Sequence, residues 1–461
     1  MSLQSRYRFT VAWLPGGWRR NVVVSVDPAG DIVDVSPDDV VTTARLINGA
    51  AIPGMPNVHS HAFQRAMAGL AERRGTAHSD SDDSFWTWRE TMYDLASRMS
   101  PECLNAVAAQ CYADMLKAGY TAVCEFHYLH NQADGTPYAD RGTMCQALID
   151  AATTAGIGLT LLPTLYQTAD FGGAAPTARQ RQFVLATDQY LDLVDGLSQA
   201  HAQSPQVQIG VALHSLRAVP PDALRTVLTS LPASKAIHIH IAEQEREVAA
   251  AQQHLGARPI EWLVEHARLD RRWCLVHATH ATPAELKAVA ATGAVIGLCP
   301  TTEANLGDGL FPLPTWLAAG GTFAIGSDSH ITLSPAEELR WLEYQARLAS
   351  KHRNVLAGQN EVSSGALLWK HACSAGTRAT ARNIGALETG RRADIVVVDT
   401  SGPLFIGRDQ DELIDTFVFA GSGHEVRDVM VAGRWLVQEG RHFAETAIAA
   451  GYKRAMNKIL E

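Results

Sequence analysis

The sequence predicts an α/β protein: a closed parallel (β/α)8 TIM-like barrel with a small β-sandwich formed by the N- and C-terminal segments. Within residues 51–386, apolar strand-like stretches alternate eight times with segments of helical spacing, which is the pattern of such a barrel. Residues 1–50 and 387–461 instead hold short strands separated by turn residues. Because the ends of a chain often lie close together, we expect these two β-rich segments to pair with each other.

The eight expected barrel strands share an apolar run that ends near a polar residue. In chain order they are AIPGMPNVHSH, TAVCEFHYL, IGLTLLPTLY, VQIGVALHSL, AIHIHIAE, WCLVHATH, AVIGLCPT and TFAIGSDSH. Residues 101–119 and 282–293 carry apolar side chains at helical spacing and end at a glycine, which suits a helix C-terminus. The long irregular insertion of residues 71–84 is interpreted as a mobile loop over the barrel mouth.

The two terminal segments carry hairpin patterns. NVVVSV and IVDVSP flank the turn sequence DPAGD, which predicts two antiparallel strands near the N-terminus. Near the other end, RRADIVVVD predicts one strand, and VRDVMVAGRWLVQEG predicts two strands about a turn at Ala432 and Gly433. Both terminal segments are therefore expected to consist mainly of strands, whereas strands alternate with helices in the middle of the chain.

Composition and charge exclude several classes of function. The 461 residues are 46% apolar and 19% charged, as in a globular protein with a large core. The net charge of −9, without a basic block, argues against nucleic acid or a membrane surface as partner. The sequence contains neither a transmembrane stretch nor a secretory signal, and its seven cysteines are scattered without a Cys-x-x-Cys pair. We therefore expect a cytoplasmic protein with reduced thiols.

Polar residues gather at the ends of the expected strands, where a (β/α)8 barrel carries its chemistry. They are His59 and His61, Glu125 and His127, His214, His238 and His240, His277, and Asp328 and His330. With 18 histidines in the chain, chance gives roughly 0.7 His-x-His pairs (18 × 17/461), so a single pair is weak evidence, but this chain has two. Burying such groups together at one end of a barrel is costly unless a cation holds them.

The strand ends therefore predict a metal site. Imidazole nitrogens and carboxylate oxygens bind zinc, and a catalytic zinc keeps one position for water. The residues expected to supply the ligands of one Zn²⁺ per chain are His59, His61, His240 and Asp328. Iron or another divalent metal would accept the same donors. His238 should lie one layer deeper as a packed or supporting residue, which leaves His277 and Glu243 for proton transfer.

Four of these stretches resemble a known family. The amidohydrolase superfamily has four signature segments, which are similar, in order, to PGMPNVHSHAF, HIHIAEQ, LVHATH and IGSDSH. The stretch GALETGRRADIVVVD resembles the segment with which the chain of that superfamily returns from the barrel to a small β-sandwich. The pattern from His240 to Glu243 is similar to the branch of deaminases with one metal. The binuclear branch carries a bridging lysine on the fourth strand, where this chain has VALHSLRAV, so the resemblance implies a single metal.

A narrower resemblance implies the substrate. HSHAFQRAMAGLAERR, DDSFWTWRETMYDLA, EFHYLHN and LHSLRAV resemble the N-formimino-L-glutamate deiminase (formimidoylglutamate iminohydrolase) family of bacterial histidine degradation. The resemblance implies zinc, a homodimer, and hydrolysis of the formimino group to N-formyl-L-glutamate and ammonia. It also implies substrate contacts from Gln64, Arg89, Tyr128, His214 and Arg217. Two arginines suit a small dicarboxylate, since the guanidinium group is a planar fork for carboxylates.

In the expected mechanism, His277, alone or with Asp328, takes a proton from the attacking water, and Glu243 protonates the departing nitrogen. Three alternatives remain at this stage. The chain could deaminate an aromatic base of the guanine, cytosine or triazine type, which has no need of two arginines. It could act on the shorter formimino-aspartate with the same residues. A barrel without catalytic activity is disfavoured, because every ligand position is filled.

Overall fold

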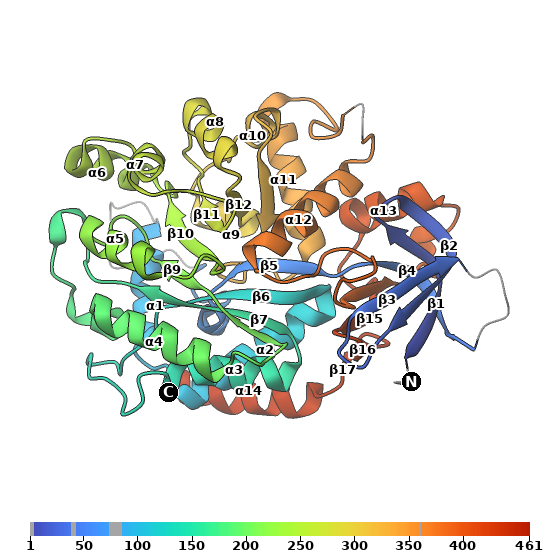
Figure 1. Ribbon diagram of the computed structural model, residues 1–461, viewed down its shortest axis with the longest axis horizontal. Helices are drawn as coiled ribbons and strands as arrows, with labels where there is room; N and C mark the ends of the chain where they lie inside the picture. Colours follow the sequence, from blue (N-terminus) through green and yellow to red (C-terminus); the bar gives the residue numbers. More distant parts are fainter. Residues whose placement is uncertain (1–3, 38–42, 73–84, 359–360) are drawn as a thin grey trace.

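The computed structural model describes residues 4–37, 43–72, 85–358 and 361–461, and its larger part is a parallel barrel (Figure 1). The barrel strands follow the sheet order β13-β12-β11-β10-β9-β7-β6-β5, with β8 paired to β7. Their bounds are Met55–Ser60 (β5), Tyr120–His127 (β6), Gly158–Leu165 (β7), Val207–Ile209 (β8), Val211–Leu213 (β9), Ile237–Ile241 (β10), Trp273–His277 (β11), Val295–Leu298 (β12) and Thr322–Ile325 (β13). The eight-stranded barrel predicted from the sequence is confirmed, with its fourth strand divided into β8 and β9.

Helices follow the strands and cover the outside of the barrel (Figure 1). They are η1 (Ala62–Met67), α1 (Phe85–Ala96), α2 (Pro101–Ala118), α3 (Thr143–Ala155), η2 (Phe171–Gly173), η3 (Ala178–Phe183), α4 (Thr187–Ala200), α5 (Pro221–Ser230), α6 (Glu245–Leu255), α7 (Pro259–His266), α8 (Pro283–Thr292), α9 (Pro300–Leu306), α10 (Leu313–Ala318), α11 (Pro335–Ser350) and α12 (Ser364–Ala379). The start of α2 shows why they form: Ser100 Oγ accepts a hydrogen bond from the backbone N–H of Cys103, and Pro101 occupies the first turn. Gly119, with φ of 106°, ends that helix in the left-handed conformation.

The barrel closes between its first and last strands. Ser60 and Asp328 form a parallel bridge, in which the backbone N–H of Asp328 donates to His59 O at 3.0 Å and that of His61 donates to Asp328 O at 3.2 Å. Gly326 permits this approach, since a Cβ atom there would lie 2.7 Å from His59 Cβ and 2.8 Å from His59 O. The backbones of β5 and β13 therefore meet where the sequence places two expected metal ligands.

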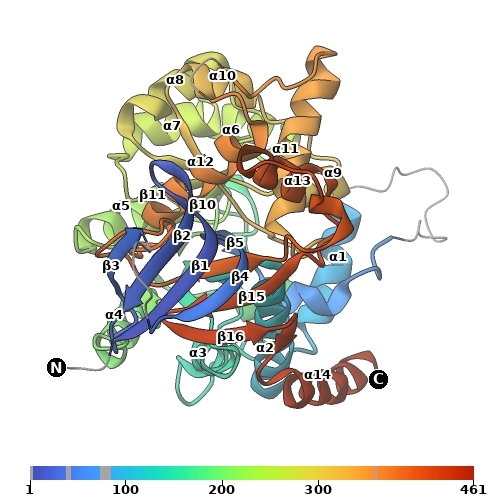
Figure 2. The same cartoon turned by 90° about the vertical axis from the view of Figure 1, so that its right-hand side faces the viewer.

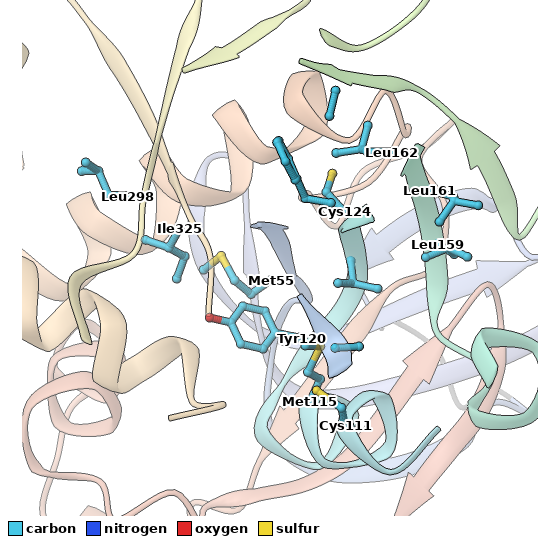
Figure 3. Packing of buried hydrophobic residues seen from close by; sticks show 14 of the residues in the cluster. Met55, Cys111, Met115, Tyr120, Cys124, Leu159, Leu161, Leu162, Leu298 and Ile325 are labelled. Carbon is cyan, nitrogen blue, oxygen red and sulfur yellow. The ribbon is translucent and has the colours of Figure 1, made fainter. Parts of the chain in front are cut away.

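Apolar side chains of the barrel strands and of α2 form a buried cluster. Met55, Met115, Tyr120 and Cys124 are fully buried in it (Figure 3), together with neighbours from β7, β12 and β13. The end of α12 contacts the barrel interior, because the carbonyl of Ala379 accepts a hydrogen bond from His238 Nε2 at 2.8 Å. All seven cysteines are buried and free. His238 thus lies in the packed interior, one layer below His240 on β10.

The two ends of the chain form a second sheet of order β17-β16-β15-β14-β4-β1-β2-β3. The bounds are Ser5–Leu14 (β1), Gly17–Val26 (β2), Ile32–Pro37 (β3), Arg45–Pro53 (β4), Ile395–Val398 (β14), Val426–Val431 (β15), Arg434–Gln438 (β16) and Arg441–His442 (β17). The N-terminal β4 pairs antiparallel with the C-terminal β14, for example at Ile52 and Val396. Tyr7 on β1 reaches Trp435 on β16, with ring centroids 5.5 Å apart, although the two strands are not neighbours in the order. The sheet therefore folds over its own core as a sandwich.

Two helices of the C-terminal segment pack against the barrel. Helix α13 (Leu413–Ala420), between β14 and β15, contacts α11, and α14 (Glu445–Leu460), after β17, lies along α2 (Figure 2). Arg98 Nη1 donates to the carbonyl of Ile459 at 3.0 Å, and Lys117 pairs with Glu445. The short 3₁₀ turns η4 (Pro403–Phe405) and η5 (Gln410–Glu412) precede α13. The division of the chain at residues 50/51 and 386/387 stays a prediction.

Two further expectations concern the loop over the barrel mouth and membrane-spanning helices. Of the loop expected over residues 71–84, residues 73–84 lie outside the described part of the structure. Among the described residues, none of the helices has the length and apolar content needed to span a membrane.

We predict that Gly326→Ala destabilises the protein by separating β5 from β13. The added Cβ would press on backbone atoms of His59 rather than on a flexible side chain, which typically costs about 1–3 kcal/mol. Thermal unfolding should show a lower Tm. Gly196→Ala in α4 is the control, since nothing lies within 4 Å of its Cβ position and alanine favours a helix. An unchanged Tm for Gly326→Ala would contradict the closing role of this contact.

Candidate metal centre and active site

Three histidine side chains converge at the barrel mouth. His59 Nε2 lies 3.1 Å from His61 Nε2 and 3.0 Å from His240 Nε2. The first two come from the end of β5 and the residue after it, and the third comes from β10. All three side chains are buried. The expected imidazole ligands are therefore brought together around one point.

Hydrogen bonds to backbone carbonyls determine the protonation of two of these rings. His61 Nδ1 lies 2.7 Å from Phe126 O, and His240 Nδ1 lies 3.0 Å from His214 O. A carbonyl only accepts hydrogen bonds, so both Nδ1 atoms carry the proton and donate. Burial, reinforced at His59 and His240 by neighbouring histidines, lowers the pKa of all three rings, which are therefore neutral.

The Nε2 atoms of His61 and His240 consequently present lone pairs to the same small space. Each of these lone pairs faces His59 Nε2 at about 3 Å, where a single N–H could donate to only one of them, whereas a shared cation would bind all three nitrogens. Asp328, just after β13, adds a carboxylate whose Oδ1 lies 3.4 Å from both His59 Nε2 and His61 Nε2. Three neutral imidazoles and one carboxylate are a donor set that fits a divalent metal.

His277 and Glu243 lie beside this donor set. His277 ends β11 with its Nε2 3.7 Å from Glu243 Oε1 and 3.7 Å from Asp328 Oδ2. Burial raises the pKa of Glu243 to about 7, although the neighbouring His277 opposes this. Burial alone would lower the pKa of His277, but Glu243, Glu303 and Asp328 outweigh it and raise that pKa to about 10. A carboxyl with a pKa near neutrality can donate a proton at physiological pH.

A cavity lined by polar and aromatic side chains opens beside these groups. Its lining includes all five residues expected to contact substrate, which are Gln64, Arg89, Tyr128, His214 and Arg217. Gln64 Nε2 donates to the Tyr128 hydroxyl at 3.0 Å, and the guanidinium of Arg89 lies over the ring of Tyr93 at 5.5 Å. The same cavity is lined by His61, His240, Glu243, His277 and Asp328. Apart from His59, which is fully buried and does not line the cavity, the expected metal, proton-transfer and substrate residues thus share one space.

Charges of both signs line the cavity. The two arginines line it together with the carboxylates of Glu243, Glu247 and Asp328. Burial lowers the pKa of Arg89, and the positive charge of Arg217 lowers it further. Burial opposes the charged form of Arg217, but Tyr166 and Glu247 raise its pKa. A ligand that carries both anionic groups and a cationic group matches this lining.

The sequence did not reveal several acidic residues that support the site. Glu303 Oε1 lies 3.2 Å from His277 Nδ1, and Asp308 belongs to the group of metal-capable side chains around Glu243 and His277. Glu247 accepts hydrogen bonds from the backbone N–H groups of Ala242 and Glu243, both at 3.1 Å. The available signal was the run TTEANLGD directly after the seventh strand, which places two acids at a strand end.

Three strand-end residues without an assigned role are structural in this arrangement. Glu125 accepts hydrogen bonds from Ser60 Oγ at 2.6 Å, from the backbone N–H of Ala62 at 2.7 Å and from the Tyr112 hydroxyl at 3.1 Å. It thereby fixes both neighbours of His61. The Nδ1 atom of His330 lies 3.0 Å from Ser327 Oγ, and its Nε2 atom lies 3.3 Å from Ser60 Oγ. His127 is buried near His130 and Cys145.

Comparison with known proteins assigns the family. The sequence model of the amidohydrolase family matches residues 50–436. The chain belongs to the amidohydrolase family. A formimidoylglutamate deiminase of Pseudomonas aeruginosa is 48% identical over 450 residues, which cover 98% of each chain. A 5-methylthioadenosine/S-adenosylhomocysteine deaminase of Nitratidesulfovibrio vulgaris is 27% identical over 438 residues, covering 89% of this chain and 87% of the other.

Solved structures agree with this assignment. A crystal structure of an amidohydrolase from Brucella melitensis has a TM-score of 0.93 and 42% sequence identity, and it covers 99% of this chain and 100% of its own. A zinc-bound adenosine deaminase from Xanthomonas campestris has a TM-score of 0.80 at 21% identity, with coverage of 100% and 99%, which shows the shared fold. This amidohydrolase is therefore an enzyme of a metal-dependent family that hydrolyses carbon–nitrogen bonds.

We predict that the purified amidohydrolase binds a divalent metal and loses thermal stability when it is removed. Chelation would leave the facing Nε2 lone pairs uncompensated, and an ion that binds only the folded state stabilises that state. Elemental analysis and Tm measured before and after chelation provide the test. His240→Ala should lower the metal content, whereas His352→Ala, on the exposed surface, should not. A Tm that does not respond to chelation would contradict the prediction.

We also predict that Glu125 makes stability depend on pH. Burial raises its pKa from 4.5 to about 7, although hydrogen bonds from Ser60, Ala62 and Tyr112 oppose this. The folded protein therefore holds this proton more firmly than the unfolded chain, so the free energy of unfolding falls as pH rises from about 4.5 to about 7.

Glu125→Gln removes this dependence, so its Tm relative to the native protein should rise between about pH 5 and about pH 8. Glu102→Gln is the matched control. The hydrogen bond from Ser100 lowers the pKa of Glu102, so its relative Tm should not rise over the same interval. A Tm difference for Glu125→Gln that stays constant with pH would refute the assignment.

Proposed function

We propose that this amidohydrolase is a zinc-dependent formimidoylglutamate deiminase that converts N-formimino-L-glutamate and water to N-formyl-L-glutamate and ammonia. One observation carries the proposal: a single cavity joins the metal-capable donor set, the His277–Glu243 pair and two arginines. The 48% identity to a formimidoylglutamate deiminase over 98% of both chains supports it. The substrate carries two carboxylates and a cationic formimino group, which matches the charges that line this cavity.

Zinc is the proposed metal because its usual ligands in catalytic sites are imidazole nitrogens and carboxylate oxygens. His59, His61, His240 and Asp328 would hold it, and iron or another divalent metal remains the alternative. When bound, the ion would lower the pKa of water and so supply a nucleophile near neutral pH. A zinc-bound adenosine deaminase with the same fold is consistent with this choice.

The cavity residues fix the substrate. Arg89 and Arg217 bind its two carboxylates, and Gln64, Tyr128 and His214 make the other polar contacts. Holding the substrate at both ends places the formimino carbon beside the donor set, which removes much of the entropic cost of the reaction. Gln64, Tyr128 and His214 also contact one another. Gln64 donates a hydrogen bond to Tyr128, and the rings of Tyr128 and His214 lie 5.7 Å apart, so these three side chains restrain one another on the cavity lining.

Asp328 and Glu243 transfer the protons in this proposal, and His277 stabilises the developing charge. The oxygen of water adds to the formimino carbon, and Asp328 accepts the proton released in that step. His277, whose raised pKa favours the imidazolium, stabilises the negative charge that develops on this oxygen. Glu243 protonates the terminal nitrogen, the carbon–nitrogen bond breaks, and ammonia leaves while the hydroxyl proton passes to the Glu243 carboxylate and the formyl C=O bond forms. The proposed division assigns the base role to Asp328 rather than to His277.

We predict that Glu243→Gln keeps the bound metal and loses turnover by about 10²–10⁴-fold, since the amide cannot protonate the departing nitrogen. Ammonia release from N-formimino-L-glutamate, with metal content measured on the same preparation, is the assay. Glu245→Gln, two residues away on the exposed side of α6, is the matched control and should keep normal activity. Near-normal turnover of Glu243→Gln would remove this residue from the chemistry.

The same assay separates the remaining candidates for the substrate. Formimino-aspartate would use the same residues with a chain one carbon shorter, and its kcat/KM compared with that of formimino-glutamate decides between the two acids. Guanine, cytosine and a triazine test the aromatic alternative, which has no use for Arg89 and Arg217. A homodimer in the cytoplasm, acting in histidine degradation, completes the proposal.

A further inference from the structure

We propose that Glu303 is a positioning residue of the reaction, which holds the His277 ring through Nδ1 so that Nε2 faces Glu243 and Asp328. The proposal rests on the deiminase function stated above and adds a residue to it. It is based on the hydrogen bond between Glu303 Oε1 and His277 Nδ1, which is 3.2 Å long and completely enclosed by protein.

The backbone around His277 has an unusual conformation. His277 and the following Ala278 have φ angles of 69° and 51°, in the left-handed region that non-glycine residues rarely adopt. The chain therefore turns sharply at the end of β11 instead of continuing an extended strand. Such conformations cost energy and persist where the surroundings hold them.

The ring itself has two orientations that differ little in intrinsic energy, because the torsion between Cβ and an imidazole is broad. In the observed orientation, Nδ1 meets Glu303 and Nε2 lies 3.7 Å from both Glu243 Oε1 and Asp328 Oδ2. In the flipped orientation, a carbon atom of the ring would replace Nε2 on the cavity side. A hydrogen bond at one ring nitrogen is what fixes the direction and protonation of the other.

Glu303 is well placed to select the observed orientation because it is itself immobilised. Its side chain is 0% exposed, and its Oε1 also accepts a hydrogen bond from the backbone N–H of Cys299 at 2.9 Å. That bond fixes the carboxylate to the first turn of α9, which follows directly after β12. Glu303 thus connects the seventh barrel strand to the residue that ends the sixth.

A buried carboxylate that has no functional partner destabilises the folded protein. Burying an ionised group is costly, and Glu303 Oε2 has no hydrogen-bond partner among the described residues. By contrast, Glu338 is also 0% exposed and uses both oxygens structurally, accepting from Thr301 N–H at 3.0 Å and Thr301 Oγ1 at 2.6 Å. The two carboxylates support the same helix, but only Glu303 reaches His277.

This pair provides a matched experiment. Glu303→Ala and Glu303→Gln are compared with Glu338→Ala and Glu338→Gln in the full-length metal-loaded enzyme, with N-formimino-L-glutamate as substrate. We expect Glu303→Ala to lower kcat on the order of 10- to 100-fold, as is typical for residues that orient a histidine in a metal site, with KM nearly unchanged. Glu303→Gln should recover part of kcat, since its amide oxygen can still accept from Nδ1. Metal content and Tm should change no more than in the Glu338 variants.

The outcomes separate the two proposals. If the native enzyme releases no ammonia from N-formimino-L-glutamate, the proposed function is wrong, and the His277 Nδ1 proton signal described below then decides the positioning role by itself: a signal kept in Glu303→Ala contradicts that role. If the native enzyme is active and Glu303→Ala retains its kcat, the positioning role is wrong. The role is also wrong if activity falls only in proportion to lost metal or stability, or if KM rises instead of kcat falling. Loss of the Nδ1 proton signal of His277 in nuclear magnetic resonance spectra of Glu303→Ala, with the signal kept in Glu338→Ala, supports it independently of turnover.

Discussion

The contact that closes the barrel also builds the metal site. The backbone bridge between Ser60 and Asp328 joins the first strand to the last, and its hydrogen bonds involve the backbones of His59 and His61. Three of the four expected ligands therefore lie within one closing contact, and only His240 comes from across the barrel. The fold and the site are not independent here. A change that loosened the join between β5 and β13 would separate Asp328 from the two imidazoles, and a metal bound by all of them would in turn hold the barrel shut.

Beneath the ligands lies a buried polar network that supports this contact. Asn57 Nδ2 donates to Ser327 Oγ at 2.7 Å, and Ser60 Oγ donates to Glu125. His330 lies within hydrogen-bonding distance of Ser327 and Ser60, so both sides of the closure share partners. Buried polar groups are tolerated when they are hydrogen-bonded, and a connected network then allows few alternative arrangements. The ligands consequently lie on a rigid base, as a metal site requires.

Much of this was predictable because strand ends of a (β/α)8 barrel meet at one rim. His59, His61, His240 and Asp328 are far apart in sequence, but each follows an apolar strand, so their convergence required only the fold class. Glu303 was not predictable in this way. It lies within a short helix, and its role depends on how far that helix tilts back toward β11. The division of the fourth strand at Gly210 and the return of α14 to the barrel likewise depend on packing between distant segments, which has no local signature.

The charge arrangement in the cavity bears most directly on the substrate. Two guanidinium groups line one enclosed space, and the charge of Arg217 lowers the pKa of Arg89, which is the effect of repulsion between like charges. A ligand with two carboxylates supplies an opposite charge to both arginines, whereas an uncharged aromatic base supplies none. Glu243, Glu247 and Asp328 also line the cavity and favour a cationic group. A cationic formimino group joined to a dicarboxylate therefore offers a partner to the charges of both signs in this lining.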